Sequence, residues 1–476
     1  MWLIYVIDIV AVAVLVAIAA RRGAEQVLPV AAFILVLVPR DAALQLPGLF
    51  DLTTQRVVLV ALIGLYFLFP ATDPRSGRFD TPLKWLIIAH IVWCLISTAN
   101  SIVPLMSLKK MVSEVFEYYL LYYIFFRTIR DVRTINRILF AIVSAIIVSS
   151  VFGAIEAYGD WSVMQWFPAV VHRFEGWSAI GTLSGRDVRV VSTFAHPILF
   201  GAGLTMAIVL ALYLLKTTND SRKKIFLWGG LLLMFLNIYK TSSRGPWLGL
   251  IVSLSLLLLF DKGRVRKYLT VIGVIILAVF VIRPGVLDTI VNIYYATFDL
   301  SSPLGTSYEY RYALRDLAVK TVSKDMTREL WGYGMESFYY LGLEGELNGR
   351  PYRFLSCDSS WLEVMVETGY GGLLIIASIL FTPAWRAWRH FRHSSDRQRH
   401  ANLYFLVNMV AYYFMMLSVA MYSWGQTGYM LWIIIAASLA YSRLEKTQAH
   451  AAKVLQRIDD SMSLTLVTTP SMDQGC

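Results

Sequence analysis

The sequence predicts an all-α fold, a polytopic membrane protein with about 12–14 transmembrane helices. Stretches of about 15 or more mostly apolar residues recur from Trp2 to Tyr441, separated by short charged loops. Of the 476 residues, 57% are hydrophobic and 16% are charged, and the mean hydropathy is +0.58. A soluble domain carries about 25% charged residues. The composition therefore excludes an ordinary soluble protein.

The expected helices are apolar spans bounded by charged residues or by helix breakers. They cover residues 2–20, 25–38, 55–70, 84–98, 111–126, 138–158, 196–215, 225–240, 246–260, 268–284, 360–382, 403–421 and 428–442. The first span has no basic segment before it and no clear cleavage site, which indicates an anchor and not a removed signal peptide. Pro197 suits the first turn of its helix. Gly245 and Pro246 mark a tight turn between two spans.

Lys and Arg gather in alternate loops, the pattern of the cytoplasmic side of membrane proteins. These loops surround Arg21, Arg78, Arg130, Arg222, Arg264 and Arg389, and the series ends with the C-terminal tail. The N-terminus is therefore expected outside and the tail inside. Residues 1–442 form the predicted transmembrane domain, with long outer loops at 159–195 and 285–359. The tail, 443–476, begins as a helix and ends in a Ser/Thr-rich, partly disordered stretch.

The net charge of +11 follows mostly from this asymmetry, and contact with anionic lipid explains it better than nucleic-acid binding does. The three cysteines give no disulfide framework. Only His172 and His196 lie on the outer side, too few for a histidine metal site. We therefore expect no metal and no cofactor.

Two polar clusters on the outer side precede membrane spans. The segment GRDVRVVSTFAHP places Arg186 and Arg189 before the Pro197 helix, with Thr193 as its expected cap. A snorkelling basic loop is the alternative. The turn KTSSRGPW holds Lys240 and Arg244 in a short loop on the outer side. Lys and Arg are normally rare in short loops on that side of a membrane protein. Cations at membrane depth are costly and indicate a functional site.

Two further clusters lie in and after the loop 285–359, which has a helical pattern at 308–322 and is expected to fold over the membrane domain. Arg311 and Arg315 are four residues apart and share one helix face, with Glu309 as a possible partner; a solvated face is the alternative. Asp358 directly precedes a helix start at Ser359 or Ser360, and Glu367 follows within the helix. Helix capping is the alternative role for Asp358.

Together these clusters place arginines and a carboxylate on one side of the membrane. Guanidinium groups match phosphate oxygens with two parallel hydrogen bonds. The chain has no Walker loop, no Rossmann fingerprint and no outer Asp-x-Asp pair. This favours a lipid-linked diphosphate over a soluble or metal-bound nucleotide as ligand.

In this order the clusters resemble the O-antigen ligase and O-antigen polymerase superfamily of bacterial inner-membrane proteins. The resemblance covers about residues 185–380 and rests on Thr193, Phe194 and Pro197, the turn Ser243–Gly245, and Arg311. Gly332, Gly334 and the segment Asp358–Gly372 complete it. It implies a metal-independent inverting glycosyltransferase of undecaprenyl-diphosphate-linked oligosaccharides, multi-pass, with its site facing the periplasm. A chain-length regulator and a flippase are candidate partners beside the bilayer.

The resemblance implies arginines that hold the diphosphate, and under the polymerase hypothesis the candidate residues take the following roles. The diphosphate-binding candidates are Arg189, Arg244, Arg311, Arg186, Arg315 and Lys240. The catalytic candidates are Asp358 first and Glu367 second. Trp177, Trp331 and Trp361 are candidates for stacking on sugars, with an interfacial aromatic belt as the alternative. Glu114 and Glu117, near the outer end of the fifth span, are further intramembrane acids of interest.

Asp358 and Ser359 stand where ligases of this superfamily commonly carry His-Asn, which favours a polysaccharide polymerase. A ligase that transfers glycan to lipid A-core or protein is the alternative. A bicarbonate-type or other small-solute transporter also remains open, although transporters place polar groups near the bilayer midplane and here they lie at one face.

Overall fold

The chain forms a bundle of helices with two small hairpins in a computed structural model. The structure describes residues 2–40, 43–44, 51–69, 80–159, 161–167, 189–194, 196–261, 266–271, 273–274, 291–292, 294–296, 298–299, 303–347, 349–393 and 396–467.

The N-terminal half contains the helices that precede the turn at residue 240. They are α1 (Trp2–Arg22), η1 (Ala24–Gln26), α2 (Val27–Leu37), α3 (Thr54–Leu68), α4 (Lys84–Ala99), α5 (Pro104–Glu114), η2 (Val115–Tyr119), α6 (Leu120–Thr128), α7 (Val132–Gly159), η3 (Val163–Trp166), α9 (Pro197–Thr217) and α10 (Ser221–Lys240). Strands β1 (Ala43–Leu44) and β2 (Leu52–Thr53) pair antiparallel.

The C-terminal half continues the bundle and adds a segment outside it. Its elements are α11 (Arg244–Phe260), α14 (Pro303–Val322), α15 (Met326–Trp331), η4 (Phe338–Tyr340), β3 (Leu343–Leu347), β4 (Arg350–Phe354), α16 (Ser360–His393), α17 (Asp396–Met415) and α18 (Gly425–Val467). Strands β3 and β4 form an antiparallel hairpin, with Leu343 opposite Phe354 and Leu347 opposite Arg350.

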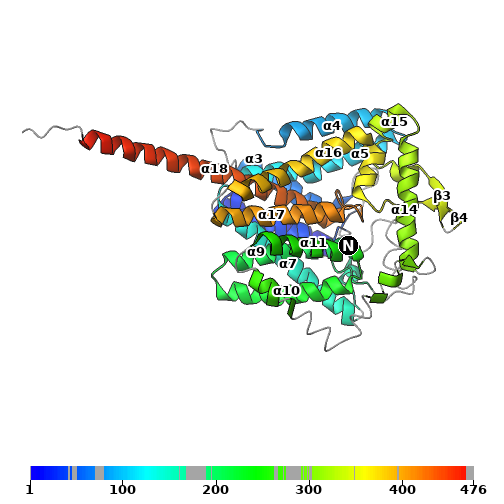
Figure 1. Ribbon diagram of the computed structural model, residues 1–476, viewed down its shortest axis with the longest axis horizontal. Coiled ribbons are helices and arrows are strands. Elements are labelled where there is room, and N and C mark those ends of the chain that lie inside the picture. Colours follow the sequence, from blue (N-terminus) through cyan, green and yellow to red (C-terminus); the bar gives the residue numbers. More distant parts are fainter. Residues whose placement is uncertain are drawn as a thin grey trace, which may run out of the picture.

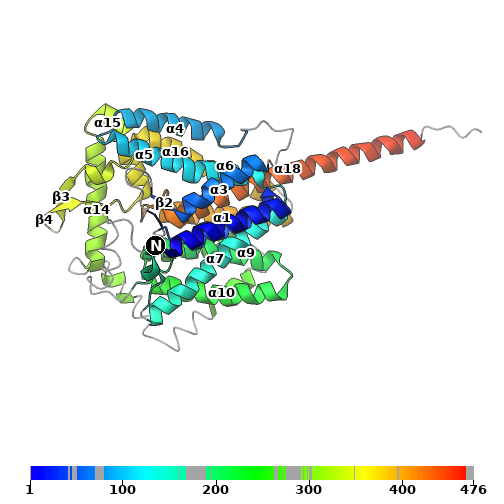
Figure 2. The same cartoon turned by 180° about the vertical axis from the view of Figure 1, so that it is seen from behind.

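The bundle helices run roughly side by side, and α14 crosses their ends (Figure 1). Helix α9 lies at the centre, where it contacts α7, α10, α11 and α17. It is the most buried candidate span, with 94% of its apolar window inside the protein. The N-terminus lies at the end of the bundle that carries α14, whereas α18 projects from the opposite end (Figure 2).

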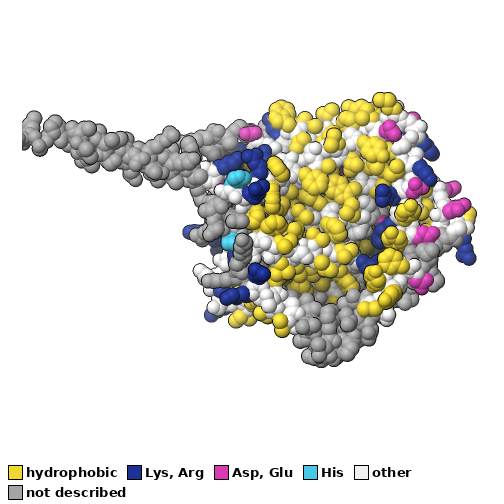
Figure 3. Space-filling model, in the orientation of Figure 1, with side chains coloured by type: hydrophobic (Ala, Val, Ile, Leu, Met, Phe, Trp, Pro, Cys, Tyr) yellow, Lys and Arg dark blue, Asp and Glu magenta, His cyan; other side chains and the backbone are white. Residues whose placement is uncertain are grey.

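A broad area of apolar side chains covers this face of the bundle between two charged ends (Figure 3). Ile251, Leu259, Leu374 and Phe381 on α11 and α16 are among its exposed members. Four helices, α1, α7, α9 and α16, are long and apolar enough to cross a bilayer, and several shorter apolar helices accompany them. An apolar area of this kind is what a bilayer requires of a protein surface, and the predicted all-α polytopic fold is confirmed.

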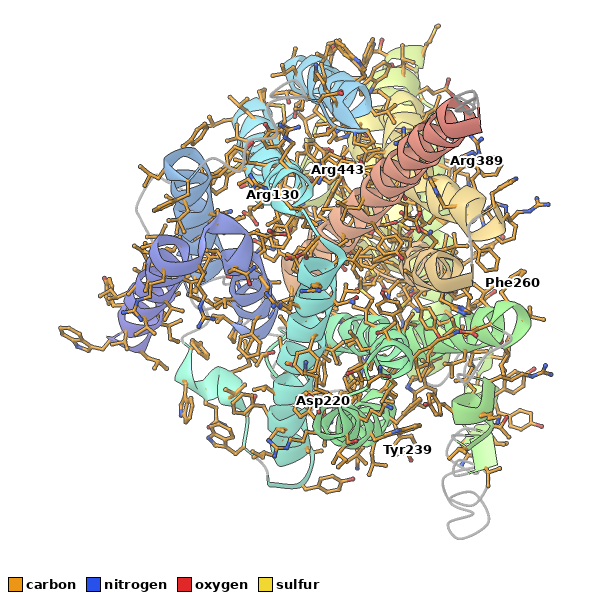
Figure 4. The ribbon with its side chains drawn as sticks, turned by 90° about the vertical axis from the view of Figure 1, so that its left-hand side faces the viewer. Arg130, Asp220, Tyr239, Phe260, Arg389 and Arg443 are labelled. Atoms are coloured by element: carbon orange, nitrogen blue, oxygen red, sulfur yellow. The ribbon has the colours of Figure 1, made fainter. Side chains whose placement is uncertain are left out.

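The end from which α18 projects is rich in basic residues (Figure 4). Arg130 follows α6, Arg389 belongs to the last turns of α16, and Arg443 lies in α18. An Arg443 guanidinium nitrogen donates to the carbonyl of Ile129, which joins α18 to the connection between α6 and α7. We call this the basic face, and the end that carries α14 the capped face.

Each predicted span overlaps a helix; in the span 268–284 the described residues 268–271 and 273–274 are helical, and the rest lies outside the described residues. The helix expected at 308–322 is present as α14. Helix α17 stops at Met415, short of the predicted 421, because the backbone of residues 416–421 instead bonds the start of α16. Helix α18 continues well into the predicted tail, to Val467.

Helix α16 has a break that the sequence did not predict. Gly369 has a φ of 69°, a conformation that favours glycine. A Cβ at Gly369 would lie 2.3 Å from the carbonyl oxygen of Leu330 in α15. Gly332, with the same φ, would meet the backbone of Glu367 in the same way. The two glycines let α15 enter the break in α16 and tie the outer segment to the bundle.

Candidate functional site

Arg189 and the turn after α10 form one unit at the capped face. The Arg189 Nε donates to the carbonyl of Thr241 at 3.0 Å, and a terminal nitrogen donates to Ser243 Oγ at 2.7 Å. The backbone N–H of Val190 also donates to the carbonyl of Lys240. The cluster around Arg189 and the turn that holds Arg244 are therefore in direct contact, although they are far apart in the chain. Arg189 bonds Ser243, the residue before Arg244.

A glutamate at the end of α7 fixes the backbone that carries Arg189. Glu156 Oε2 accepts from the N–H groups of Val191 and Ser192, at 3.3 and 2.7 Å. Ser192 has a φ of 55°, which is uncommon for a residue with a side chain. The hydrogen bonds to Glu156 offset the cost of this conformation and hold the segment in place.

Thr193 does not cap α9, so that prediction was wrong. Its Oγ1 instead lies 2.8 Å from Ser149 Oγ, and its carbonyl accepts from Gln426. His196 is the cap, because its Nδ1 accepts from the N–H of Ile198 at 3.2 Å. The cap moves because Pro197 has no N–H and is the first helical residue, which makes residue 196 the N-cap.

His196, at the start of α9, is influenced by the charges of two of the predicted arginines. The histidine is buried and its ring stacks on Trp424 at 6.2 Å between centroids. Burial and the positive charges of Arg189 and Arg311 lower its pKa to about 3, so it is neutral at physiological pH. The charges of Arg189 and Arg311 thus both affect one imidazole, although these arginines come from segments far apart in the chain.

Arg311 of α14 pairs with Asp358, at 3.1 Å between a guanidinium nitrogen and Oδ2. Burial raises the pKa of Asp358, and the charge of Arg311 opposes this shift. The Arg311 Nε is buried and has no hydrogen-bond partner within the described part of the chain. A buried donor without a partner is costly, so this nitrogen is available to a ligand oxygen.

Asp358 is not the helix cap. Ser359 takes that place, since its carbonyl accepts from the N–H of Glu363 and its Oγ accepts from the N–H of Leu362. The start of α16 is also held by residues 416–421: Ser360 Oγ donates to the carbonyl of Val419 and accepts from the N–H of Met421.

Arg244 opens α11 next to the same 416–421 segment. A Cβ on the following residue, Gly245, would lie 2.3 Å from Ser418 Oγ, so the two backbones pack closely. Since this segment also holds the start of α16, the turn with Arg244 and the loop with Asp358 share one support. We call Arg189, Arg244, Arg311, His196 and Asp358 the arginine cluster.

The outer segment, α14 to β4, packs on the bundle and places Arg311. Leu314, Ala318 and Val322 of α14, with Phe354 of β4, form a small core with Val366 of α16. The Tyr310 hydroxyl donates to the carbonyl of Ser356 at 2.7 Å. We call residues 303–347 and 349–354 the cap segment. Its packing on α16 is the arrangement expected for the second long loop.

A cavity of about 560 Å³ lies beside the arginine cluster. Its wall includes Ser356 and Cys357, the residues before Asp358, together with Leu199 and Trp424 near His196. Its carboxylates are those of Asp51, Glu114, Glu117, Glu336, Glu363 and Glu367. Its cations are Arg40, Arg56 and Lys110. The described lining is therefore acidic on balance, and we call this space the acidic cavity.

Glu117 is fixed at the wall of the acidic cavity by an unusual local structure. It lies in η2, a π-helical turn between α5 and α6, and such turns are frequent at functional sites. Glu117 Oε1 accepts from Arg56 Nε and from a terminal nitrogen of Arg56, at 2.8 and 2.7 Å. Oε2 accepts from the Tyr429 hydroxyl at 2.7 Å. This network orders the cavity wall.

Glu367 lies in the wall of the same cavity and is buried. The break in α16 exposes its carbonyl, which accepts from Ser97 Oγ and from the N–H of Gly334. The two candidate carboxylates thus have different surroundings: Asp358 faces Arg311, and Glu367 faces the acidic cavity.

The other predicted residues do not join the arginine cluster. Lys240 lies over the Tyr158 ring at 5.0 Å, and Arg315 is exposed on α14. Trp331 packs on Trp93 with centroids 4.0 Å apart. Trp361 donates to the carbonyl of Tyr413 and stacks on Phe381. These contacts favour packing roles for both tryptophans. Arg186 and Trp177 lie outside the described residues.

Sequence reasoning missed His196 as part of the cluster and most of the acidic cavity. His196 was considered only as a metal ligand, although its place before Pro197 marks it as a cap. Arg40 and Arg56 border the second and third spans, where a cation at the outer side was a usable signal. Glu336 and Glu363 carried no local pattern that would have distinguished them.

Residues 229–377 match the family model described as O-antigen ligase, and no curated protein matches the chain. The matched part runs from α10 into α16 and includes Arg244, Arg311, Asp358 and Glu367, whereas Arg189 and His196 precede it. The resemblance expected over about 185–380 is confirmed for this part. The chain is a membrane protein that carries an O-antigen ligase family domain in residues 229–377.

Proposed function

We propose that this protein is a polysaccharide polymerase that joins undecaprenyl-diphosphate-linked repeat units at the periplasmic face. The observation that carries the proposal is the arginine cluster beside the acidic cavity. One part offers guanidinium groups to an anionic donor, and the other offers carboxylates to a hydroxyl-bearing acceptor. The capped face would be periplasmic, since the opposite face is rich in Lys and Arg.

The donor diphosphate would lie against Arg189, Arg244 and Arg311. Arginine forks bind phosphate oxygens bidentately, and the two fixed hydrogen bonds of Arg189 to residues 241 and 243 preorganise that side chain. The unpartnered Nε of Arg311 supports the same role. Neutral His196 adds no charge, so it would act as a spacer that orders the two guanidinium groups around the diphosphate.

The reaction would be a direct displacement at the anomeric carbon of the donor sugar. A hydroxyl oxygen of the acceptor forms the new bond to that carbon as the bond to the diphosphate oxygen breaks. The hydroxyl proton passes to Asp358 or Glu367, and undecaprenyl diphosphate leaves with the bonding electrons. Such a displacement inverts the anomeric centre. Arginines that stabilise charge on the leaving group act most strongly in a site that excludes water, and the cap segment supplies that cover.

Binding of the donor would also change the partner of Arg311. In the absence of substrate Arg311 pairs with Asp358. A diphosphate that attracts Arg311 would leave the Asp358 carboxylate to accept the proton of the acceptor hydroxyl. Asp358 would then become a base only when the donor is present.

A ligase that transfers finished glycan to another acceptor is the second candidate, and the description of the matched family favours it. The pair Asp358-Ser359, in place of the His-Asn expected of ligases, favours the polymerase. The lipid-linked glycans of cells that lack the protein separate the two. Single repeat units on the lipid carrier would support the polymerase. Long chains stranded on the carrier would refute it in favour of the ligase.

A further inference from the structure

A second cavity opens at the basic face, remote from the arginine cluster. It has a volume of about 760 Å³ and lies between the start of α2, the start of α7 and the connection from α9 to α10. Its polar wall carries four cations, Arg22, Arg133, Arg137 and Lys223. We call this space the basic groove. Figure 4 looks onto the face where it lies, with Asp220, the cap of α10, labelled.

The charge of the basic groove is not balanced by the described residues around it, where Arg137 donates to the neutral amide oxygen of Gln26. No carboxylate belongs to its described lining, and none of the four cations forms an ion pair within the part of the chain that the structure describes. The two nearby acids have other roles: Glu25 accepts from the N–H of Arg130, and Asp220 accepts from the N–H of Arg222. Four like charges around one space repel each other unless an anion binds between them.

The inner wall of the basic groove is apolar. Leu214 and Leu227 are buried there, and Phe33 and Phe140 are half-buried beside them. Lys223 lies over the Phe140 ring at 5.9 Å, so the cation and the apolar wall are adjacent. A soluble anion would use the cations only. A ligand that carries both a phosphate and acyl chains would use both walls.

We propose that the basic groove binds the headgroup of an anionic phospholipid, with the start of its acyl chains against α2, α7 and α10. Three observations carry this: four cations without an ion pair among the described residues, an adjoining apolar wall, and a place at the end of the membrane-spanning helices. Basic pockets between transmembrane helices bind anionic headgroups in this way, and the volume lies within the range of about 300–1,000 Å³ of small-ligand sites. The bound lipid stabilises the contact of α2 with α7.

The test compares three double variants of exposed arginines on the same face. Arg22→Gln with Arg133→Gln removes two cations of the basic groove, and neither side chain makes a hydrogen bond within the described chain. Arg21→Gln with Arg130→Gln is the matched control, since these residues are neighbours in sequence or on the same face but do not line the groove. Arg22→Lys with Arg133→Lys keeps the charge.

Binding of phosphatidylglycerol to the purified full-length protein is measured by native mass spectrometry over a range of lipid concentrations. A basic residue near a membrane surface changes lipid affinity about 5-fold, so the Gln pair should weaken the tightest binding step about 25-fold. The control pair and the Lys pair should bind as the unmodified protein does. Phosphatidylethanolamine should bind much more weakly, and inorganic phosphate should not displace phosphatidylglycerol.

Equal loss of binding in the control pair would overturn the proposal, because the effect would then be one of total surface charge. Unchanged binding in the Gln pair would overturn it too. Displacement by inorganic phosphate would show a site for free phosphate instead of a lipid. Elution of each variant as a single species of normal size confirms folding, and Lys223→Gln provides an independent variant if the first pair fails to fold.

Discussion

Replacing Asp358 by Asn separates a chemical role for this residue from a structural one. The change keeps the shape of the side chain and an oxygen that can accept from Arg311, but it removes the charge. Since Ser359 caps α16, the variant leaves the helix start intact. Donor binding should survive as well, because the arginines are untouched.

The structural cost of Asp358→Asn follows from its ion pair. The Asp358 and Arg311 side chains are 29% and 31% exposed, and pairs exposed to this degree contribute about 0.2–1 kcal/mol. Stability should therefore change by less than about 1 kcal/mol. Loss of a general base, in contrast, slows turnover about 100- to 10,000-fold. A catalytic role for Asp358 would therefore appear as a large loss of turnover, whereas the stability would change little under either role.

The assay measures polymer formed by reconstituted protein from lipid-linked repeat units, together with the thermal unfolding midpoint. Asp316→Asn is the matched control, because Asp316 also forms an ion pair in the cap segment, with Lys320 at 2.7 Å, but is not a member of the arginine cluster. A rate for Asp358→Asn similar to that of the control would refute the role of this residue. Glu367 would then be the remaining candidate base.

The remaining predictions concern charge, metal, topology and pH. Arg244→Ala should lower turnover about 100- to 1,000-fold, as the loss of one transition-state donor does, with partial rescue by Lys, which lacks the fork; normal polymer at normal protein level would contradict this. Treatment with a strong chelator should leave the rate unchanged, and a loss restored by magnesium would contradict the metal-independent mechanism. A reporter fused at Gly349, between β3 and β4, should behave as periplasmic; cytoplasmic behaviour would invert the proposed topology. Because the pKa of Asp358 is raised from its ordinary 3.8, its base form is lost on acidification at a higher pH than for a free Asp, and kcat measured against pH should show this acid limb.

The fold was predictable where one physical requirement dominates. Burial of about 20 apolar residues in a bilayer leaves a signal in almost every span, and the helix α14 of the outer loop carries its own pattern. The break of α16 at Gly369 was not predictable, because Gly369 and Gly332 are explained only by the close approach of two segments. The early end of α17 depends in the same way on a partner, the start of α16.

The candidate site was predictable in part, and the limit has a physical cause. Cations in short outer loops are conspicuous because the bilayer disfavours them, which is how Arg244 stood out. The positions of these arginines relative to one another could not be predicted from the sequence, because Arg189 contacts residues 241 and 243 only in the folded chain. Trp331 and Trp361 were candidates for stacking on sugars, but their rings pack on Trp93 and Phe381. The sequence does not distinguish an interfacial aromatic residue that stacks on a sugar from one that packs on another aromatic ring.

The role of a buried acid in the acidic cavity depends on whether a cation is paired with it. Glu117 alone indicates a functional acid. In the structure it accepts two hydrogen bonds from Arg56 and one from Tyr429, so its charge is already balanced and it can order the cavity without taking a proton. Glu367 has no such arginine among the described ion pairs. The surroundings of Glu117 and Glu367 therefore suit different roles in the proposed reaction: Glu117 would shape the space for the acceptor, whereas Glu367, like Asp358, would be a candidate to receive its proton.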